Sequence, residues 1–201
     1  MNEVNRLFCP NCKKSVEAII TYSKGDEIYK CSICGEILNP DVTPPIKENN
    51  IISNNVKKKI VIIEDNKLHM EIIKKTLHNN FNVDILTFNS GYKFIGETIP
   101  YYLNKERYSL IIVDIGLPQL NGVEISMVFR EIERGFGIKN KSPILFFTAY
   151  KLSEKLKNYF KACSPSTYLP KGLVTTPEKF SSRLLKSINL LNTYSDKDIR
   201  L

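Results

Sequence analysis

The chain has 201 residues, of which 42% are hydrophobic and 25% charged, so it can form one large globular domain or two modest ones. Its net charge of +8 makes nucleic acid a partner to consider, but the basic residues are scattered and do not form one block. No apolar run reaches the about 18 residues that a membrane span needs, and no secretory leader pattern opens the sequence. These features argue against a membrane protein and predict a cytoplasmic one.

Cysteine spacing indicates a metal site near the N-terminus. Four of the five cysteines form two CxxC pairs: Cys9, Cys12, Cys31 and Cys34. The 18 residues between the pairs are close to the spacing of a four-thiolate zinc site. Segments 18–22 and 27–29 flank a turn at 24–26 and predict a hairpin that closes the other end. We therefore predict a zinc-ribbon domain over residues 1–39, with zinc bound by the four cysteines.

Other interpretations of these residue types stay open. Similar cysteine knuckles hold a single iron in rubredoxin-like proteins, so iron is the less favoured ion. A redox dithiol is less consistent with the sequence, because two matched pairs are better explained as four ligands. The fifth cysteine, Cys163, is predicted to be a small buried hydrophobic residue. His69 and His78 are predicted to be surface or packing residues on a helix.

The rest of the chain alternates between short apolar runs and amphipathic stretches. Residues 40–57 contain three prolines and predict a linker. The predicted strands are 60–63, 83–88, 110–113, 144–147 and 168–169. Stretches at helical spacing lie between these runs, the least regular of them near 91–103. Because parallel strands need crossovers and are buried on both faces, the pattern predicts an α/β domain over 58–193 with a doubly wound five-stranded parallel sheet, followed by a tail over 194–201.

Polar residues follow four of the predicted strands. Glu64 and Asp65 follow the first strand, Asp114 the third, Thr148 the fourth and Lys171 the fifth. In a parallel sheet, ligands collect beyond the carboxyl ends of the strands. Three carboxylates would repel one another, and Mg²⁺ would relieve this because it binds oxygen ligands. One aspartate could then act as nucleophile toward a phosphoryl group, with a cation and a hydroxyl beside it.

These segments resemble the receiver domain of response regulators in two-component signalling, over about residues 58–191. The motifs IVIIED, VDIGLPQLNG and ILFFTA occur in the family's order, and Tyr168 lies three residues before Lys171. The resemblance implies a flavodoxin-like receiver fold. One departure is that Lys171 is preceded by Pro170 and followed by Gly172, whereas receivers usually have proline directly after the lysine.

The resemblance also implies roles for single residues. Asp114 would accept phosphate from a histidine kinase or a phosphotransfer protein, with Lys171 beside it. The ligands of Mg²⁺ would be Glu64, Asp65, Asp114 and the backbone carbonyl of Gly116. Thr148 would then move toward the phosphate and Tyr168 would turn inward, which changes the surface formed by the fourth helix, the fifth strand and the fifth helix.

We therefore predict a response regulator that signals through this surface and the zinc ribbon to a downstream protein, and that is not an enzyme. After Leu191 only about ten residues remain, so no further output domain is expected. A dehalogenase-type phosphatase would need a second acid where Gly116 stands. Two alternatives are a degenerate receiver that acts as a phosphorylation-independent scaffold, and a nucleic-acid-binding adapter that uses the ribbon and the basic helix at 151–161. Phosphorylation-dependent homodimerisation also stays open.

Overall fold

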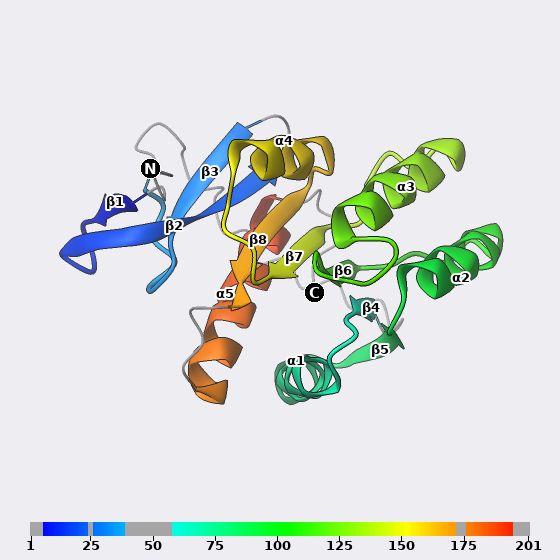
Figure 1. The fold of residues 1–201 in the computed structure, drawn as a ribbon, viewed down its shortest axis with the longest axis horizontal. Helices are drawn as coiled ribbons and strands as arrows, with labels where there is room; N and C mark the ends of the chain where they lie inside the picture. Colours follow the sequence, from blue (N-terminus) through cyan, green and yellow to red (C-terminus); the bar gives the residue numbers. More distant parts are fainter. Residues whose placement is uncertain (1–5, 24–25, 39–57, 172–175, 195–201) are drawn as a thin grey trace.

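The computed structural model describes residues 6–23, 26–38, 58–171 and 176–194. Within these ranges, eight strands form one sheet in the order β1-β2-β8-β7-β6-β4-β5, with β3 paired to β2 (Figure 1). No helix in the described ranges is long and apolar enough to cross a membrane. The predicted linker over 40–57, the centre of the predicted turn at 24–26, Gly172 and nearly all of the predicted tail lie outside them.

Five parallel strands form the centre of the sheet. They are β4 (Lys58–Ile63), β5 (Val83–Phe88), β6 (Leu110–Asp114), β7 (Ile144–Thr148) and β8 (Ser166–Pro170). They pair in the order β5-β4-β6-β7-β8. Every residue of β6, β7 and β8 is buried, which explains the continuous apolar runs at 110–113 and 144–147. The predicted α/β flavodoxin-like sheet is confirmed, and each predicted strand lies within an observed one.

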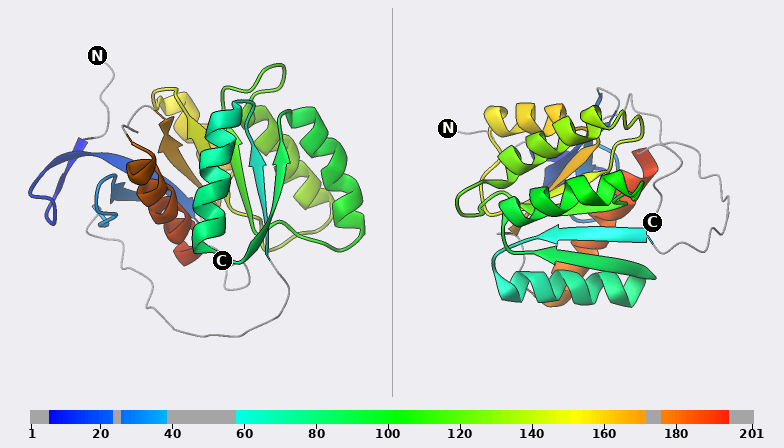
Figure 2. Two further views of the ribbon diagram at one scale, coloured as in Figure 1. Left: turned by 90° about the horizontal axis from the view of Figure 1, so that it is seen from below. Right: turned by 90° about the vertical axis from the view of Figure 1, so that its right-hand side faces the viewer.

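Helices cover both faces of this sheet. They are α1 (Lys67–Asn80), α2 (Gly91–Leu103), α3 (Gly122–Gly135), α4 (Glu154–Ala162) and α5 (Pro177–Tyr194). One face carries α1 and α5, whose Leu77 and Leu184 are buried against the sheet, and the other carries α2, α3 and α4 (Figure 2). On that second face Phe94, Phe129 and Phe160 contribute one aromatic residue from each helix to the core. The irregular stretch near 91–103 is therefore a helix, stabilised by burial of its apolar side.

The N-terminal residues 6–38, called the ribbon here, extend the same sheet. The ribbon contains β1 (Arg6–Cys9), β2 (Lys14–Ser23) and β3 (Asp26–Cys31), and β2 with β3 forms the predicted antiparallel hairpin. The far end of β2 also pairs antiparallel with β8, and β2 contacts both α4 and α5 (Figure 1). The predicted domain boundaries stay predictions, but a sheet shared by the ribbon and the parallel strands was not predicted.

Candidate functional site

The predicted polar residues meet at one edge of the parallel sheet. Asp114 is the last residue of β6 and Thr148 the last of β7, while Glu64 directly follows β4 and Lys171 directly follows β8. Because parallel strands end at the same edge, these side chains come from distant parts of the sequence into one site. Asp65 follows Glu64, and its carboxylate lies with those of Glu64 and Asp114 in one cluster.

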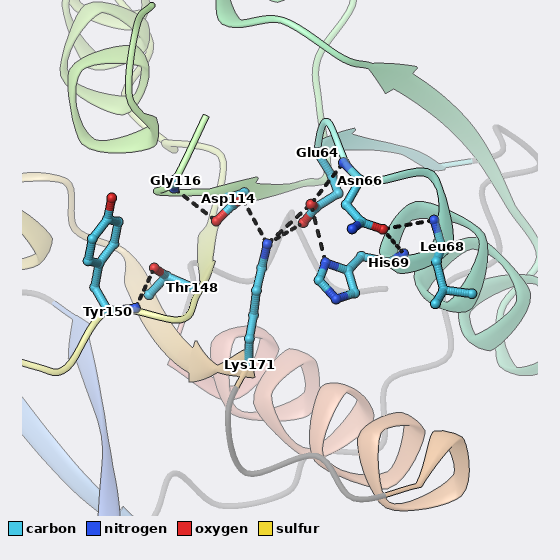
Figure 3. Close-up of polar contacts among 9 residues, drawn as sticks. All are labelled: Glu64, Asn66, Leu68, His69, Asp114, Gly116, Thr148, Tyr150 and Lys171. Atoms are coloured by element: carbon cyan, nitrogen blue, oxygen red, sulfur yellow. Dashed lines mark hydrogen bonds and ion pairs between the residues drawn. The ribbon is translucent and has the colours of Figure 1, made fainter. Parts of the chain in front are cut away.

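Lys171 lies at the centre of this site (Figure 3). Its Nζ is 2.7 Å from Asp114 Oδ2, 2.9 Å from Glu64 Oε2 and 3.1 Å from Glu64 Oε1. Glu64 is only 1% exposed and Asp114 6% exposed. Burial raises the pKa of Glu64, and the ammonium group of Lys171 opposes this increase. A single cation therefore compensates two buried carboxylates.

The start of α1 fixes the orientation of Glu64. Asn66 caps this helix, with its side-chain oxygen accepting hydrogen bonds from the backbone N–H groups of Leu68 and His69 (Figure 3). The backbone N–H of Asn66 donates to Glu64 Oε1 at 3.2 Å. His69 Nδ1 lies 3.4 Å from the same oxygen, and its ring packs edge-on against Phe147. The contact of His69 with the site was not predicted, although an asparagine before an apolar helical pattern marks where α1 begins.

Gly116 lies beside the carboxylate of Asp114. The backbone N–H of Gly116 donates to Asp114 Oδ1 at 2.9 Å, and Gly116 itself is exposed. A Cβ atom at this position would lie 3.4 Å from Asp114 Oδ2. The absence of a side chain therefore leaves space beside Asp114 Oδ2, while the N–H group provides a fixed positive dipole.

Gly122 allows α3 to begin against the backbone of Asp114. A Cβ atom there would lie 2.1 Å from the carbonyl oxygen of Asp114 and 2.9 Å from Ile115 Cα, so the backbone itself would have to move. We expect Gly122→Ala to lower the free energy of unfolding by about 1–3 kcal/mol, measured by urea unfolding. Gly96→Ala is the matched control, because nothing lies within 4 Å of its Cβ position in α2. That change should stabilise the chain by about 0.5–1 kcal/mol, and equal destabilisation by both would contradict the steric explanation.

The three carboxylates suit a hard divalent cation. One oxygen from each of Glu64, Asp65 and Asp114 can be chosen so that all three lie within 4.8 Å of one another. Asp65 is exposed, so water can reach the same position. Oxygen ligands that leave room for several waters are those that Mg²⁺ prefers, and the residues therefore fit this ion.

Thr148 and Tyr168 are connected through the backbone of Tyr150. The N–H of Tyr150 donates to Thr148 Oγ1 at 3.1 Å, and its carbonyl accepts a hydrogen bond from the Tyr168 hydroxyl at 3.0 Å. Burial raises the pKa of Tyr168 to about 12, so this hydroxyl stays protonated and can donate. Tyr168 is already buried here and stacks on Phe160. Sequence reasoning missed Tyr150 because it acts through main-chain atoms, which residue type does not reveal.

The four ribbon cysteines converge as predicted. Cys9 Sγ lies 3.5 Å from Cys34 Sγ, and Cys12 Sγ lies 3.7 Å from Cys31 Sγ. A disulfide would require about 2.05 Å, whereas sulfurs bound at about 2.3 Å to a tetrahedral ion lie about 3.8 Å apart. The cysteine cluster therefore fits a tetrahedral metal site.

The backbone of the two CxxC turns supports the same fit. Both turns direct N–H groups toward sulfur, from Cys12 to Cys9 and from Cys34 to Cys31, each at 3.4 Å. The residue after each turn, Lys13 or Gly35, has a positive φ of 52° or 82°. The two turns thus have matching geometry, and N–H groups aimed at sulfur favour the thiolate form that a metal needs.

Comparison with known proteins identifies the family. Residues 60–176, more than half of the chain, match the response regulator receiver domain family. The chain is 31% identical over 116 residues to the transcriptional regulatory protein CrdR of Helicobacter pylori, an alignment that covers 58% of this chain and 49% of CrdR. The chain thus spans about half the length of this curated relative.

Solved structures show the same fold. A mutant receiver domain of the histidine kinase CKI1 from Arabidopsis thaliana superposes with a TM-score of 0.56 at 14% identity, covering 67% of this chain and 89% of that one. The phosphorylated cyanobacterial phytochrome response regulator RcpA superposes with a TM-score of 0.50 at 21% identity, covering 67% of this chain and 92% of RcpA. With the sequence match and the site geometry, these likenesses lead to one conclusion: the chain belongs to the response regulator receiver domain family.

Proposed function

We propose that this chain is a phosphorylation switch of two-component signalling, in which a histidine kinase or a phosphotransfer protein phosphorylates Asp114. The observation that carries this proposal is the position of Lys171 Nζ, 2.7 Å from Asp114 and 2.9 Å from Glu64. A buried carboxylate beside a fixed cation, with space left next to Gly116, suits an acceptor of a phosphoryl group. The structurally similar RcpA was crystallised in phosphorylated form.

The transfer step follows from this geometry. An Asp114 carboxylate oxygen attacks the phosphorus of a phosphohistidine, and the bond from phosphorus to the imidazole nitrogen breaks. The electron pair stays on that nitrogen, which takes up a proton. Lys171 and the N–H of Gly116 are placed to stabilise the negative charge that spreads over the phosphoryl oxygens.

The carboxylates of Glu64, Asp65 and Asp114, with the carbonyl of Gly116, would hold Mg²⁺. Bound there, the ion would neutralise charge on the transferred group. Glu64 supports this role because Asn66 and Lys171 fix its orientation, while the exposed Asp65 leaves room for water. Gly116 stands where a dehalogenase-type phosphatase would need its second acid to release the phosphate from a small ester, so the proposed role is signalling and not catalytic turnover.

Signal output would begin at Thr148. When its hydroxyl turns to a phosphoryl oxygen, it gives up the hydrogen bond from Tyr150, whose carbonyl is held by Tyr168. The change therefore reaches β8 and the surface of α4, β8 and α5, against which the ribbon lies. We propose that the ribbon binds Zn²⁺ through its four cysteines and that a downstream protein recognises the ribbon together with this surface.

The test is intact mass after incubation with Mg²⁺ and acetyl phosphate, for the natural chain and for Asp114→Asn. The natural chain should gain one phosphoryl group only when Mg²⁺ is present, and Asp114→Asn should gain none. Because this variant keeps the size of the side chain, urea unfolding should confirm that it still folds. A phosphoryl group on Asp114→Asn would place the acceptor elsewhere, and no group on the natural chain would favour the degenerate receiver.

A further inference from the structure

We propose that the surface formed by α4, β8 and α5 is a reversible docking site for the chain's own ribbon, and that docking and phosphorylation of Asp114 stabilise each other. The coupling rests on the proposed function, whereas the docking does not. In the structure β2 adds to the outer edge of β8, with Thr21 opposite Thr167 and Tyr22 opposite Ser166. A free strand edge would offer unpaired backbone groups to another chain, so a partner could use this edge only after the ribbon has left.

The ribbon contacts both faces of the parallel sheet at this edge. On the α4 face, Ile20 and Tyr22 are buried in the same core as Tyr168. On the opposite face, Thr21 Oγ1 and Thr167 Oγ1 lie 2.9 Å apart and are both buried. These contacts bury apolar and hydrogen-bonding groups together, so the docked position is specific.

Further hydrogen bonds come from outside the paired strands. Ser164 Oγ donates to the Tyr22 carbonyl at 3.1 Å, and the ammonium group of Lys186 in α5 donates to the carbonyl of Ile33 in the ribbon. The ribbon is thus held by the loop before β8 and by α5 as well as by β8 itself. A loosely tethered module would not make contacts from three separate elements.

The same interface buries polar groups that lack a hydrogen-bond partner within the described part of the chain, which weakens it. Arg183 on α5 lines a groove of about 760 Å³ with Glu17 of β2 and is 9% exposed. Its two terminal guanidinium nitrogens are buried and have no hydrogen-bond partner among the described residues, and the Tyr22 hydroxyl has none there either. Burial lowers the pKa of Arg183, and the nearby charge of Glu17 only partly offsets this, so burying these groups disfavours the docked state. Pairing of β2 with β8 also covers two residue pairs, compared with five between β7 and β8. The docked ribbon can therefore come off without unfolding the parallel sheet.

Tyr168 connects docking to the acceptor site. Its ring lies in the core that Ile20 and Tyr22 complete, and its hydroxyl holds the carbonyl of Tyr150, next to Thr148. Docking thus keeps Tyr168 buried, and a buried Tyr168 is what the proposed switch requires after Thr148 has moved. Docking and phosphorylation both favour the buried position of Tyr168. Each event must therefore stabilise the other by the same free energy.

Three variants at the interface test how buried charge and hydrogen bonding affect docking of the ribbon. Thr21→Arg places a further cation in the buried interface, whereas in an undocked ribbon this side chain would face water. Thr21→Val is the matched control, since it keeps the size and the strand preference and removes only the hydroxyl group. Arg183→Met should act in the opposite direction, because it replaces a buried cation, whose terminal nitrogens have no hydrogen-bond partner among the described residues, with an apolar chain of similar length.

The experiment is hydrogen exchange of the full zinc-loaded chain with and without Mg²⁺ and beryllofluoride, together with the beryllofluoride affinity. Without beryllofluoride, Thr21→Arg should speed exchange in β8 about tenfold and Arg183→Met should slow it, while Thr21→Val, which loses one hydrogen bond and adds no charge, should speed it much less than Thr21→Arg. Beryllofluoride should slow exchange in β2 and β8 of the natural chain, and should bind Thr21→Arg about tenfold more weakly. Unchanged exchange in α1 and β4 checks that the parallel sheet stays folded.

Each contrary outcome contradicts a different part of the proposal. Equal exchange of β8 in Thr21→Arg and the natural chain would overturn the docking. If Thr21→Arg bound beryllofluoride as tightly as the natural chain but exchanged β8 faster, the coupling would be overturned. The docking and the proposed function would both still stand. If the natural chain did not bind beryllofluoride, the proposed function and the coupling would be overturned together. Hydrogen exchange of β8 measured without beryllofluoride would still test the docking.

Discussion

Cys12→Ser is expected to release the metal and unfold the ribbon, while the parallel sheet and its helices stay folded. The ribbon's own apolar core is small, with Cys9, Val16 and Cys31 as its buried members. Zinc bound as proposed would therefore supply much of its folding free energy, about 10–16 kcal/mol in comparable zinc peptides. If four thiolates share this equally, loss of one lowers the zinc affinity roughly 100- to 1000-fold.

Zinc content measured by native mass spectrometry checks this expectation, and hydrogen exchange of β2 and β3 reports the unfolding. Cys163→Ser is the matched control, because Cys163 is buried beyond α4 and lies outside the cysteine cluster. It should keep one zinc per chain. Zinc retained by Cys12→Ser would contradict the four-thiolate site, and iron in place of zinc in the natural chain would contradict the choice of metal.

Local sequence patterns predicted the parallel sheet and its acidic edge well. The strand 83–88 was placed to the residue, and the other four predictions fall inside observed strands. For β6 and β7 this worked because strands buried on both faces are apolar along most of their length, so the first polar residue marks their end. Asp114 and Thr148 are such residues, and the parallel arrangement then brings them to one edge.

The docking of the ribbon could not be predicted in the same way. Thr21 lies opposite Thr167 where β2 pairs with β8, yet threonine is favoured in strands generally, and the two residues are 146 positions apart in the chain. Ile20 and Tyr22 do indicate that one side of β2 is buried. They do not show whether that side packs in the ribbon's own core or against the parallel sheet. Pairing between distant strands depends on backbone groups that every sequence possesses, so only the structure identifies the partner strand.

Lys171→Met is expected to slow phosphorylation of Asp114 about 100- to 1000-fold, the usual effect of removing one fixed electrostatic stabiliser. The same change should raise the affinity for Mg²⁺. Lys171 Nζ lies between Asp114 and Glu64, within 2.7 to 3.1 Å of their oxygens, and therefore competes with a metal cation for the same negative charge. Without it, two buried carboxylates lack their counter-charge, which the metal can then supply.

A slower phosphorylation of Asp114 together with a higher affinity for Mg²⁺ distinguishes the loss of a charge from a general disruption of the site. The rate is measured by intact mass over time with acetyl phosphate, and the affinity by calorimetric titration with Mg²⁺. Lys155→Met is the matched control, because it removes the same charge from an exposed position on α4 and should change neither quantity. If Lys171→Met instead bound Mg²⁺ more weakly and also reacted more slowly, Lys171 would be needed to position the carboxylates, and its charge would not explain the transfer rate.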